Sequence, residues 1–322
     1  MVNGKNHPKN QHYVPQFILR NFAEGKKRRT HVFDKLHEKQ FVSHPKNIAA
    51  ESGFYDFEVD GTLHSLEQFM GAWETRASRI IKSIIKEESL AHLTTEDRKS
   101  LSLFAALQKL RVKSVRDGLK SLNVAVRDAL AARGADPGNI VPEMSDEAIK
   151  ETSLAQIGMA EKFAKHFHTK GWLLQRAPKG NPFYTSDSPI TLHNSFEQER
   201  RGNLGLASLG VVIYFPISSR LSICCLCPTI CQAIQHGLRT AAGESRRFGY
   251  SRVDVSDLER VATAISTGQP DPLLPENVRH QNSLQVAYSS RFVYSATDDF
   301  SLAKTMIRGN PDLKHPVEII AQ

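Results

Sequence analysis

Three side chains suited to acid–base or anion chemistry lie within nine residues near the start of the chain: His12, Tyr13 and Arg20. A histidine exchanges a proton near neutral pH, and an arginine binds phosphate or carboxylate groups through paired hydrogen bonds. Apolar anchors and a stiffening proline are interleaved with them: Val14, Pro15, Phe17, Leu19 and Phe22. Because anchors packed on a core would hold the polar groups still, this opening segment predicts a binding or catalytic site.

Two more polar side chains, Gln108 and Arg111, interrupt the apolar face of a helix that we expect from residue 94 or 95 to about 115. Phe104 and Val115 share this face, because residues three and four apart lie on one side of a helix. A buried guanidinium is costly without a partner, so Arg111 should meet a carboxylate, backbone carbonyls or an anionic ligand. A structural arginine–carboxylate bridge is the alternative.

A third candidate is the turn at 185–189, which follows an apolar run and ends in a proline. Such turns on a sheet edge often carry functional groups, here Ser186 and Asp187. Asp187 could pair with Arg111, orient His12 or bind a metal ion. The alternative is an Asx-turn in which the carboxylate caps its own backbone.

Amide side chains on a later predicted helix form a fourth, weaker group. Asn277, Asn282 and Gln285 lie on this helix, and the last two are three residues apart. Their amides could line a pocket and contact a substrate, whereas amides on a helix more often face solvent.

The residue patterns around these candidates predict short strands, then helices, then strands again. We expect a hairpin at 31–42 and a strand at 53–59, followed by helices at 65–87, 94–115, 119–133 and 146–167. Further strands are expected at 172–175, 183–185, 211–215, 221–226 and 291–295, a mobile loop at 194–205, and helices at 256–266 and 275–288.

This order, without strictly alternating strand–helix units, predicts an α+β fold: a small, mainly antiparallel sheet packed with a cluster of long helices. We expect a single domain over residues 1–322. Its regions would be an N-terminal hairpin region at 10–60, a helical region at 64–168, a strand-rich region at 171–227, and C-terminal helices with a last strand at 254–310.

The charge balance favours anionic partners. The formal net charge is +8 and the sequence pI about 9.3, which suits nucleic acids or nucleotides. No apolar run approaches the ~20 residues of a membrane helix, and residues 1–11 lack an apolar signal core. We therefore expect a cytoplasmic protein with no membrane partner.

The cysteines also favour the reducing cytoplasm. All four lie between Cys224 and Cys231, mostly in a predicted buried strand, where free thiols behave as small apolar groups. This spacing suits a tetrahedral zinc site poorly, so we expect no metal and no cofactor. The chain also lacks a phosphate-binding loop, a Gly-x-Ser-x-Gly elbow and a His-Glu-x-x-His motif, which excludes those enzyme classes in their usual forms.

Six segments together resemble the domain-of-unknown-function family 4238, a bacterial and fungal family. They are residues 12–15 with 19–22, 47–51 with 54–55, Gln108 with Arg111, 185–189, 215–218 and 291–294. They follow the family's order over about residues 10–297; Ile217 stands where a leucine is expected. The resemblance implies that His12, Gln108, Arg111 and Asp187 converge, but it implies no activity.

We therefore carry two hypotheses. In the first, the protein is a nucleic-acid phosphodiesterase of a bacterial defence or toxin-like system. His12 acts as general acid or base, Arg111 neutralises the phosphate, and Gln108 orients a water or a phosphate oxygen. Asp187 orients His12 or holds Arg111 in place. Tyr13, Arg20, Ser186 and Asn277 contact the substrate. In the second, the same residues form a non-catalytic binding module for nucleic acid, a nucleotide or a partner protein.

Overall fold

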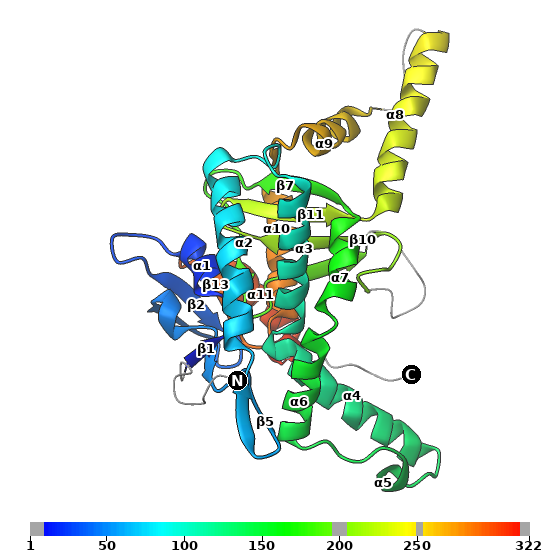
Figure 1. The fold of residues 1–322 in the computed structure, drawn as a ribbon. Helices are drawn as coiled ribbons and strands as arrows, with labels where there is room; N and C mark the ends of the chain where they lie inside the picture. The colour runs from blue at the N-terminus through cyan, green and yellow to red at the C-terminus, as the bar shows by residue number, and fades with distance from the viewer. Residues whose placement is uncertain (1–9, 195–204, 249–253, 316–322) are drawn as a thin grey trace.

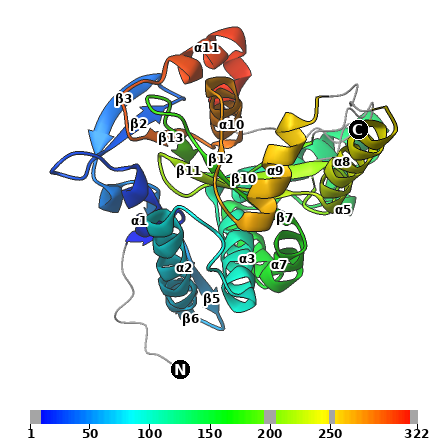
Figure 2. The same cartoon turned by 90° about the horizontal axis from the view of Figure 1, so that it is seen from above.

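The computed structural model describes residues 10–194, 205–248 and 254–315. It contains two larger sheets (Figures 1 and 2). The five-stranded sheet has the order β12-β7-β11-β10-β9, with β12 at Asp271–Pro272, β7 at Gly171–Arg176, β11 at Leu221–Leu226, β10 at Val211–Pro216 and β9 at Thr191–Asn194. Every pair in it is antiparallel except β12 with β7, so the predicted α+β fold with a mainly antiparallel sheet is confirmed.

The four-stranded sheet carries most of the sequence motifs. Its order is β3-β2-β13-β8, with β3 at Lys39–Ser43, β2 at Thr30–Asp34, β13 at Phe292–Ser295 and β8 at Thr185–Ser186. The predicted hairpin at 31–42 is confirmed by the β2–β3 pairing. Because β13 lies between β2 and β8, it brings the end of the chain against the turn that carries Asp187.

Both faces of the five-stranded sheet are covered by helices. One face packs against α3 (Thr95–Leu110) and α7 (Ala160–His168), and the other against α8 (Pro228–Phe248) and α9 (Ser256–Thr267). Burial on two sides explains why β10 and β11 are apolar without alternation. Beyond its first turns, α8 extends away from the sheets (Figure 1).

The helix that carries Gln108 is shorter than expected. A capping box of Thr94 and Asp97 starts α3, as the sequence indicates, but α3 ends at Leu110 rather than near Val115. Arg111 follows in a non-helical conformation (φ −93°, ψ 5°), and α4 (Lys113–Ala132) begins two residues later. The helix bounds expected at 115 and 119 are therefore wrong, because the chain bends where Arg111 turns into the core.

Other helix bounds also differ from expectation. The helix expected at 146–167 is two, α6 (Asp146–Ile157) and α7, separated at Gly158, a poor helix former. Two helices of the structure, α8 and α11 (Ser301–Gly309), were not predicted from the sequence pattern. Cys224 and Cys225 lie in the buried strand β11, but Cys231 lies in α8, and all four thiols are free. The loop expected at 194–205 lies almost entirely outside the described residues.

The opening segment is anchored as its apolar side chains predict. It comprises β1 (Asn10–His12), α1 (Gln16–Leu19) and a turn of 3-10 helix, Arg20–Phe22. Val14, Ile18, Leu19 and Phe22 have no exposed surface and belong to the largest apolar cluster. β1 pairs with β4 (Ala50–Ser52), which places His12 opposite Ala50. In the described part of the chain, every helix is too short or too polar to cross a bilayer.

Candidate functional site

His12 and Tyr13 are adjacent in the chain but line two different hollows. His12 lines an open cleft of about 510 Å³ beside α2 (Glu67–Glu87), here called the α2 cleft. Tyr13 lines a more enclosed cavity of about 350 Å³ beside β13, here called the β13 pocket. Consecutive side chains of an extended segment point to opposite faces, so the opening segment forms a wall between the two.

His12 and Glu67, which both line the α2 cleft, have shifted pKa values. Burial lowers the pKa of His12, against the opposing effects of the Pro45 backbone and the Glu74 carboxylate, and its Nε2 is buried with no hydrogen bond to the described residues. Burial, helped by Glu74, raises the pKa of Glu67 to about 7. Near neutral pH the cleft therefore holds a mostly neutral imidazole and a carboxyl group that still carries a proton about half of the time.

Gln108 and Arg111 lie under the wall and hold it in place. The Gln108 Nε2 donates to the Tyr13 carbonyl at 2.9 Å, and its Oε1 accepts from the Arg111 Nε and Nη2 at 3.0 and 2.7 Å. Arg111, with a side chain only 1% exposed, pairs through Nη1 with Glu74 at 2.6 Å. Of the two readings open from the sequence, these contacts match the arginine–carboxylate bridge, and they leave the guanidinium no free edge toward the cleft.

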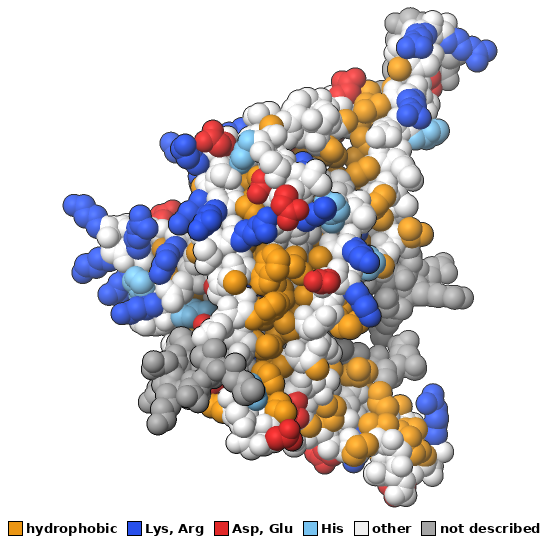
Figure 3. Space-filling view, in the orientation of Figure 1, with side chains coloured by type: hydrophobic (Ala, Val, Ile, Leu, Met, Phe, Trp, Pro, Cys, Tyr) orange, Lys and Arg blue, Asp and Glu red, His pale blue; other side chains and the backbone are white. Residues whose placement is uncertain are grey.

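The rim of the α2 cleft is cationic. Arg20, Arg79 and Lys82 line it, and no ion pair involves any of them within the described residues. Arg20 donates only to the neutral Gln16 side chain, at 2.8 Å. On this face of the molecule, Lys and Arg side chains form a band that runs from the loop before β2 across α2 (Figure 3). The rim can therefore attract an anion without first breaking a salt bridge.

Asp187 lies on the other side of the wall, in the β13 pocket, with neither His12 nor Arg111 as a partner. Its carboxylate accepts hydrogen bonds from the backbone N–H groups of Ser290, Arg291 and Phe292 at 2.8, 2.7 and 2.8 Å. Burial raises its pKa to about 6, although these hydrogen bonds oppose the shift. Asp187 therefore fixes the start of β13, and its contacts differ from the roles that the sequence suggested for it.

The other candidate residues, Ser186, Asn277 and Asn282, also lie outside the α2 cleft. Ser186 is buried and donates to Gln285 at 2.8 Å, so it joins the turn to α10 (Pro275–Tyr288). Asn277 is exposed on α10 and lines neither hollow. Asn282, on the same helix, is buried and bonds the Tyr184 N–H and the Pro182 carbonyl at 2.7 and 3.0 Å. The structure thus places His12 and Arg20 in the α2 cleft, and Tyr13 and Asp187 in the β13 pocket. Gln108 and Arg111 lie under the wall between the two hollows and line neither of them.

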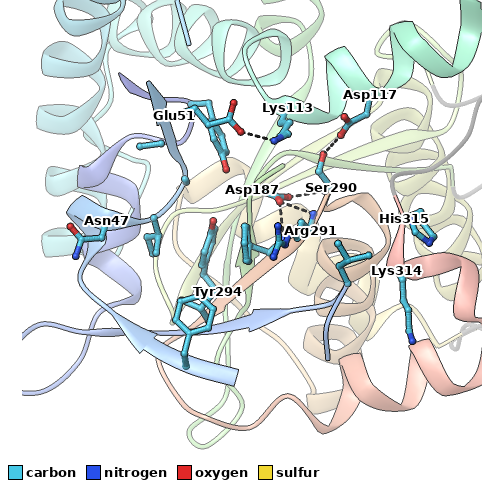
Figure 4. Close-up of a pocket in the computed structure, with 18 residues that line it drawn as sticks. Asn47, Glu51, Lys113, Asp117, Asp187, Ser290, Arg291, Tyr294, Lys314 and His315 are labelled. Carbon is cyan, nitrogen blue, oxygen red and sulfur yellow. Dashed lines mark hydrogen bonds and ion pairs between the residues drawn. The ribbon is translucent and has the colours of Figure 1, made fainter. Parts of the chain in front are cut away.

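Charged and aromatic side chains from distant segments meet in the β13 pocket (Figure 4). Lys113 and Glu51 pair at 2.5 Å on one side, and the Ser290 hydroxyl donates to Asp117 at 2.6 Å. Aromatic side chains complete the walls: Tyr13, Phe41, Phe292 and Tyr294. No group of three or more His, Cys, Asp or Glu side chains among the described residues is arranged to hold a metal ion.

Several residues of both hollows could not be recognised as site residues from the motifs, notably Glu67, Glu74 and Asp117. The signal for the first two was available, because the cleft-lining positions 67, 71, 74, 75, 78 and 82 form one polar stripe on a helix whose other face is apolar. Such a stripe normally faces solvent, and only the position of His12 beside it makes it part of a site. Asp117 gave no comparable signal.

The fold and these hollows define an α+β protein in which one anchored segment separates a cationic cleft from an aromatic, acid-containing pocket. The chain belongs to the family described as "Protein of unknown function (DUF4238)", whose model matches residues 10–299. This confirms the resemblance inferred from the motifs. No curated protein and no solved structure matches the chain. Segments 12–15, 47–51, 185–189 and 291–294 all contribute to the lining of the β13 pocket.

Proposed function

We propose that this protein is a nucleic-acid phosphodiesterase that acts in the α2 cleft. One observation carries the proposal: His12 and Glu67, whose pKa values are moved toward opposite roles, line the same cleft under a rim of cations without carboxylate partners. General acid–base catalysis needs groups that titrate near the working pH, and a phosphodiester needs cations around its oxygens.

The two groups allow a balanced hydrolysis. Neutral His12 takes a proton from a water molecule as the water oxygen bonds to phosphorus. The bond from phosphorus to the leaving oxygen breaks, and protonated Glu67 gives its proton to that oxygen. One water is consumed, and proton exchange with solvent restores both groups. This hydrolysis requires no metal ion. Arg20, Arg79 and Lys82 at the rim stabilise the charge on the phosphoryl oxygens.

Gln108 and Arg111 have positioning roles in this proposal. They tie the His12–Tyr13 wall to Glu74, the carboxylate that also acts on the pKa values of His12 and Glu67. Asp187, Tyr13 and Ser186 support the wall from the β13 side. Arg20, together with Arg79 and Lys82, contacts the substrate backbone, which suits a chain of net charge +8.

The direct test is an assay of the purified full chain on labelled RNA and on single- and double-stranded DNA, with Mg²⁺ or with EDTA. We expect cleavage that survives EDTA and falls about 100-fold or more in His12→Ala and Glu67→Gln, the usual contribution of one acid or base. Each variant is first checked for a native thermal transition.

Arg79→Ala and Arg76→Ala form a matched pair for the same assay. Both are exposed arginines on α2, but Arg76 pairs with Glu96 and does not line the cleft. Cleavage should weaken only in the Arg79 variant. The absence of cleavage of all three substrates at high protein concentration would remove the phosphodiesterase proposal.

The second candidate is a nucleic-acid-binding module without turnover, because the unpaired rim alone accounts for binding. Here Arg79→Ala weakens binding in a filter or fluorescence assay, while His12→Ala leaves it unchanged and no product forms. A role in bacterial defence or as a toxin, acting in the cytoplasm, belongs to the enzyme proposal. It predicts that expression of the wild type, but not of His12→Ala, slows the growth of the host cells.

A further inference from the structure

The β13 pocket has a charge balance opposite to that of the α2 cleft. Each lysine and arginine at its rim is already paired with a carboxylate: Lys113 with Glu51 at 2.5 Å, Arg291 with Asp34 at 2.7 Å, and Lys314 with Glu38 at 2.6 Å. No such ion pair involves Asp117 or Asp187 within the described ranges. The charges left over in this pocket are therefore negative.

One buried cation, Lys35, partly balances the negative charge of these two carboxylates. Lys35 has no exposed surface, and its Nζ donates to the carbonyls of Val286 and Ser289. Burial lowers its pKa to about 8, and the nearby Asp187 and Asp117 act in the opposite direction. Two carboxylates and one ammonium leave a net charge of about −1 when all three are ionised, which one monovalent cation would neutralise.

A buried hydroxyl in the same pocket is incompletely satisfied. The Tyr294 side chain is fully buried, and its hydroxyl makes no hydrogen bond of good geometry to the described residues, although the Ala49 backbone lies close enough to oppose the rise in its pKa. It lines the pocket and points toward its interior, and it lies near enough to Asp187 and Tyr13 to be affected by their charges (Figure 4). A buried hydroxyl without a hydrogen bond of good geometry costs free energy, so this atom is a second, independent indication of a ligand.

We propose that the β13 pocket binds a small organic cation, a primary ammonium or guanidinium group carried on an apolar or aromatic body. The cationic head lies against Asp117 and Asp187, and the Tyr294 hydroxyl completes its contacts. The rings of Tyr13, Tyr294 and Phe292 enclose the body, because aromatic faces attract cations and apolar groups. This site is separate from the α2 cleft and does not depend on phosphodiesterase activity.

The size and polarity of the pocket favour this class over a nucleotide. A cavity of about 350 Å³ fits a small molecule rather than a polymer. An anionic ligand would have to displace the carboxylate partners of Lys113, Arg291 or Lys314 and would face two unpaired carboxylates. A cation breaks none of these pairs. Burial raises the pKa values of Asp187 and Asp117, although Lys35 opposes the shift at Asp187 and Lys113 and Lys120 oppose it at Asp117. A further cation beside them would favour their ionised forms.

Titration calorimetry on the full chain at pH 7.5 tests the proposal with named probes. Phenethylamine, tyramine and agmatine are the cations, phenethyl alcohol is the neutral counterpart of phenethylamine, and guanosine monophosphate is the anion. We expect saturable binding of at least one cation with a Kd below about 1 mM, and no binding of the alcohol or the nucleotide.

Three variants separate recognition from folding. Asp117→Asn and Tyr294→Phe should each weaken cation binding about tenfold. Asp128→Asn removes the same charge from an exposed position of α4 and should leave binding unchanged. Tyr294→Phe should also keep or raise the thermal midpoint, because it removes a buried hydroxyl that makes no hydrogen bond of good geometry to the described residues.

Three results would overturn the proposal: no cation bound at about 10 mM, equal binding of phenethylamine and phenethyl alcohol, or cation binding that Asp117→Asn leaves intact. Binding of guanosine monophosphate that Lys113→Ala abolishes would assign the pocket to anions instead. Loss of nuclease activity in His12→Ala bears on none of these outcomes, so the two proposals fail separately.

Discussion

Gln108 donates a 2.9 Å hydrogen bond from its side-chain amide to the backbone carbonyl of Tyr13, ninety-five residues earlier in the chain. The same amide accepts two hydrogen bonds from Arg111 through its oxygen. One buried side chain thus provides a donor for a backbone carbonyl in the wall between the two hollows and an acceptor for two nitrogens of a buried guanidinium. Buried polar groups of this kind are costly to leave unsatisfied, which gives the contact a measurable effect.

We expect Gln108→Leu to lower the free energy of unfolding by about 2–4 kcal/mol. Leucine has a volume similar to that of glutamine, but it leaves the Tyr13 carbonyl without a donor and the Arg111 guanidinium without an acceptor. Urea unfolding followed by circular dichroism measures this change. Gln68→Leu, at an exposed position of α2, is the control and should change stability by less than about 0.5 kcal/mol. Equal effects of the two substitutions would contradict the buried network.

Two arginine–glutamate pairs at α2 offer a second comparison. Arg111 is buried against Glu74. Arg76 instead pairs with Glu96 at 3.1 Å on the surface, where the Arg76 side chain is 46% exposed and the Glu96 side chain 62%. Arg111→Met should cost about 3 kcal/mol of stability, and Arg76→Met less than about 1 kcal/mol. Unfolding in urea at 0.15 and 1 M salt measures both. Salt that abolished the Arg111 effect would show that this pair is solvated.

The amide pair on α10 separates a surface role from a buried one. Asn282→Ala should cost about 2–3 kcal/mol, because it leaves the Tyr184 N–H and the Pro182 carbonyl without partners. Asn277→Ala, at an exposed position of the same helix, should change neither stability by more than about 0.5 kcal/mol nor cleavage. A loss of cleavage in the Asn277 variant would restore the substrate contact that the sequence suggested.

The sequence predicted those parts of the structure that depend on local pattern. The hairpin β2–β3, the capping box before α3 and the apolar anchors of the opening segment follow from periodicity and capping. The end of α3 could not be predicted this way. Helix propensity continues through residue 111, whereas the carboxylate that Arg111 meets after the bend, Glu74, lies on another helix.

The grouping of the candidate residues needed the tertiary structure for the same reason. His12 and Tyr13 carry one motif, but the extended backbone sends their side chains into different hollows. Asp187 resembled a catalytic carboxylate because it stands in a tight turn, yet its partners are three N–H groups a hundred residues away. The spacing of residues along the sequence does not show which distant residues come into contact in the folded protein.

The pKa of Glu67 predicts how stability depends on pH. Its folded-state pKa, about 7, lies above the ordinary value of 4.5, so the native state binds more protons than the unfolded state between these values. This group's contribution is therefore present below pH 4.5 and is lost as the pH rises through 7. Glu67→Gln should flatten that part of the profile, measured by urea unfolding from pH 4 to 8. The slope removed should stay below ~1.4 kcal/mol per pH unit, because a single group exchanges at most one proton and solvent screens the half-exposed Glu67.

The same two groups predict the pH dependence of cleavage. His12 must be neutral to accept a proton, and its lowered pKa places the rise of kcat/KM below pH 6.5. Glu67 must be protonated to donate, so kcat/KM should fall above about pH 7. The profile is then bell-shaped, with its maximum between the two limbs. In Glu67→Gln the residual activity should lose the alkaline limb and keep the acid limb, whereas His12→Ala should do the reverse. Arg76→Ala, outside the cleft, should keep both limbs. If Glu67→Gln kept the alkaline limb, the acid would be another group, and the cleft would retain only its role in binding phosphate.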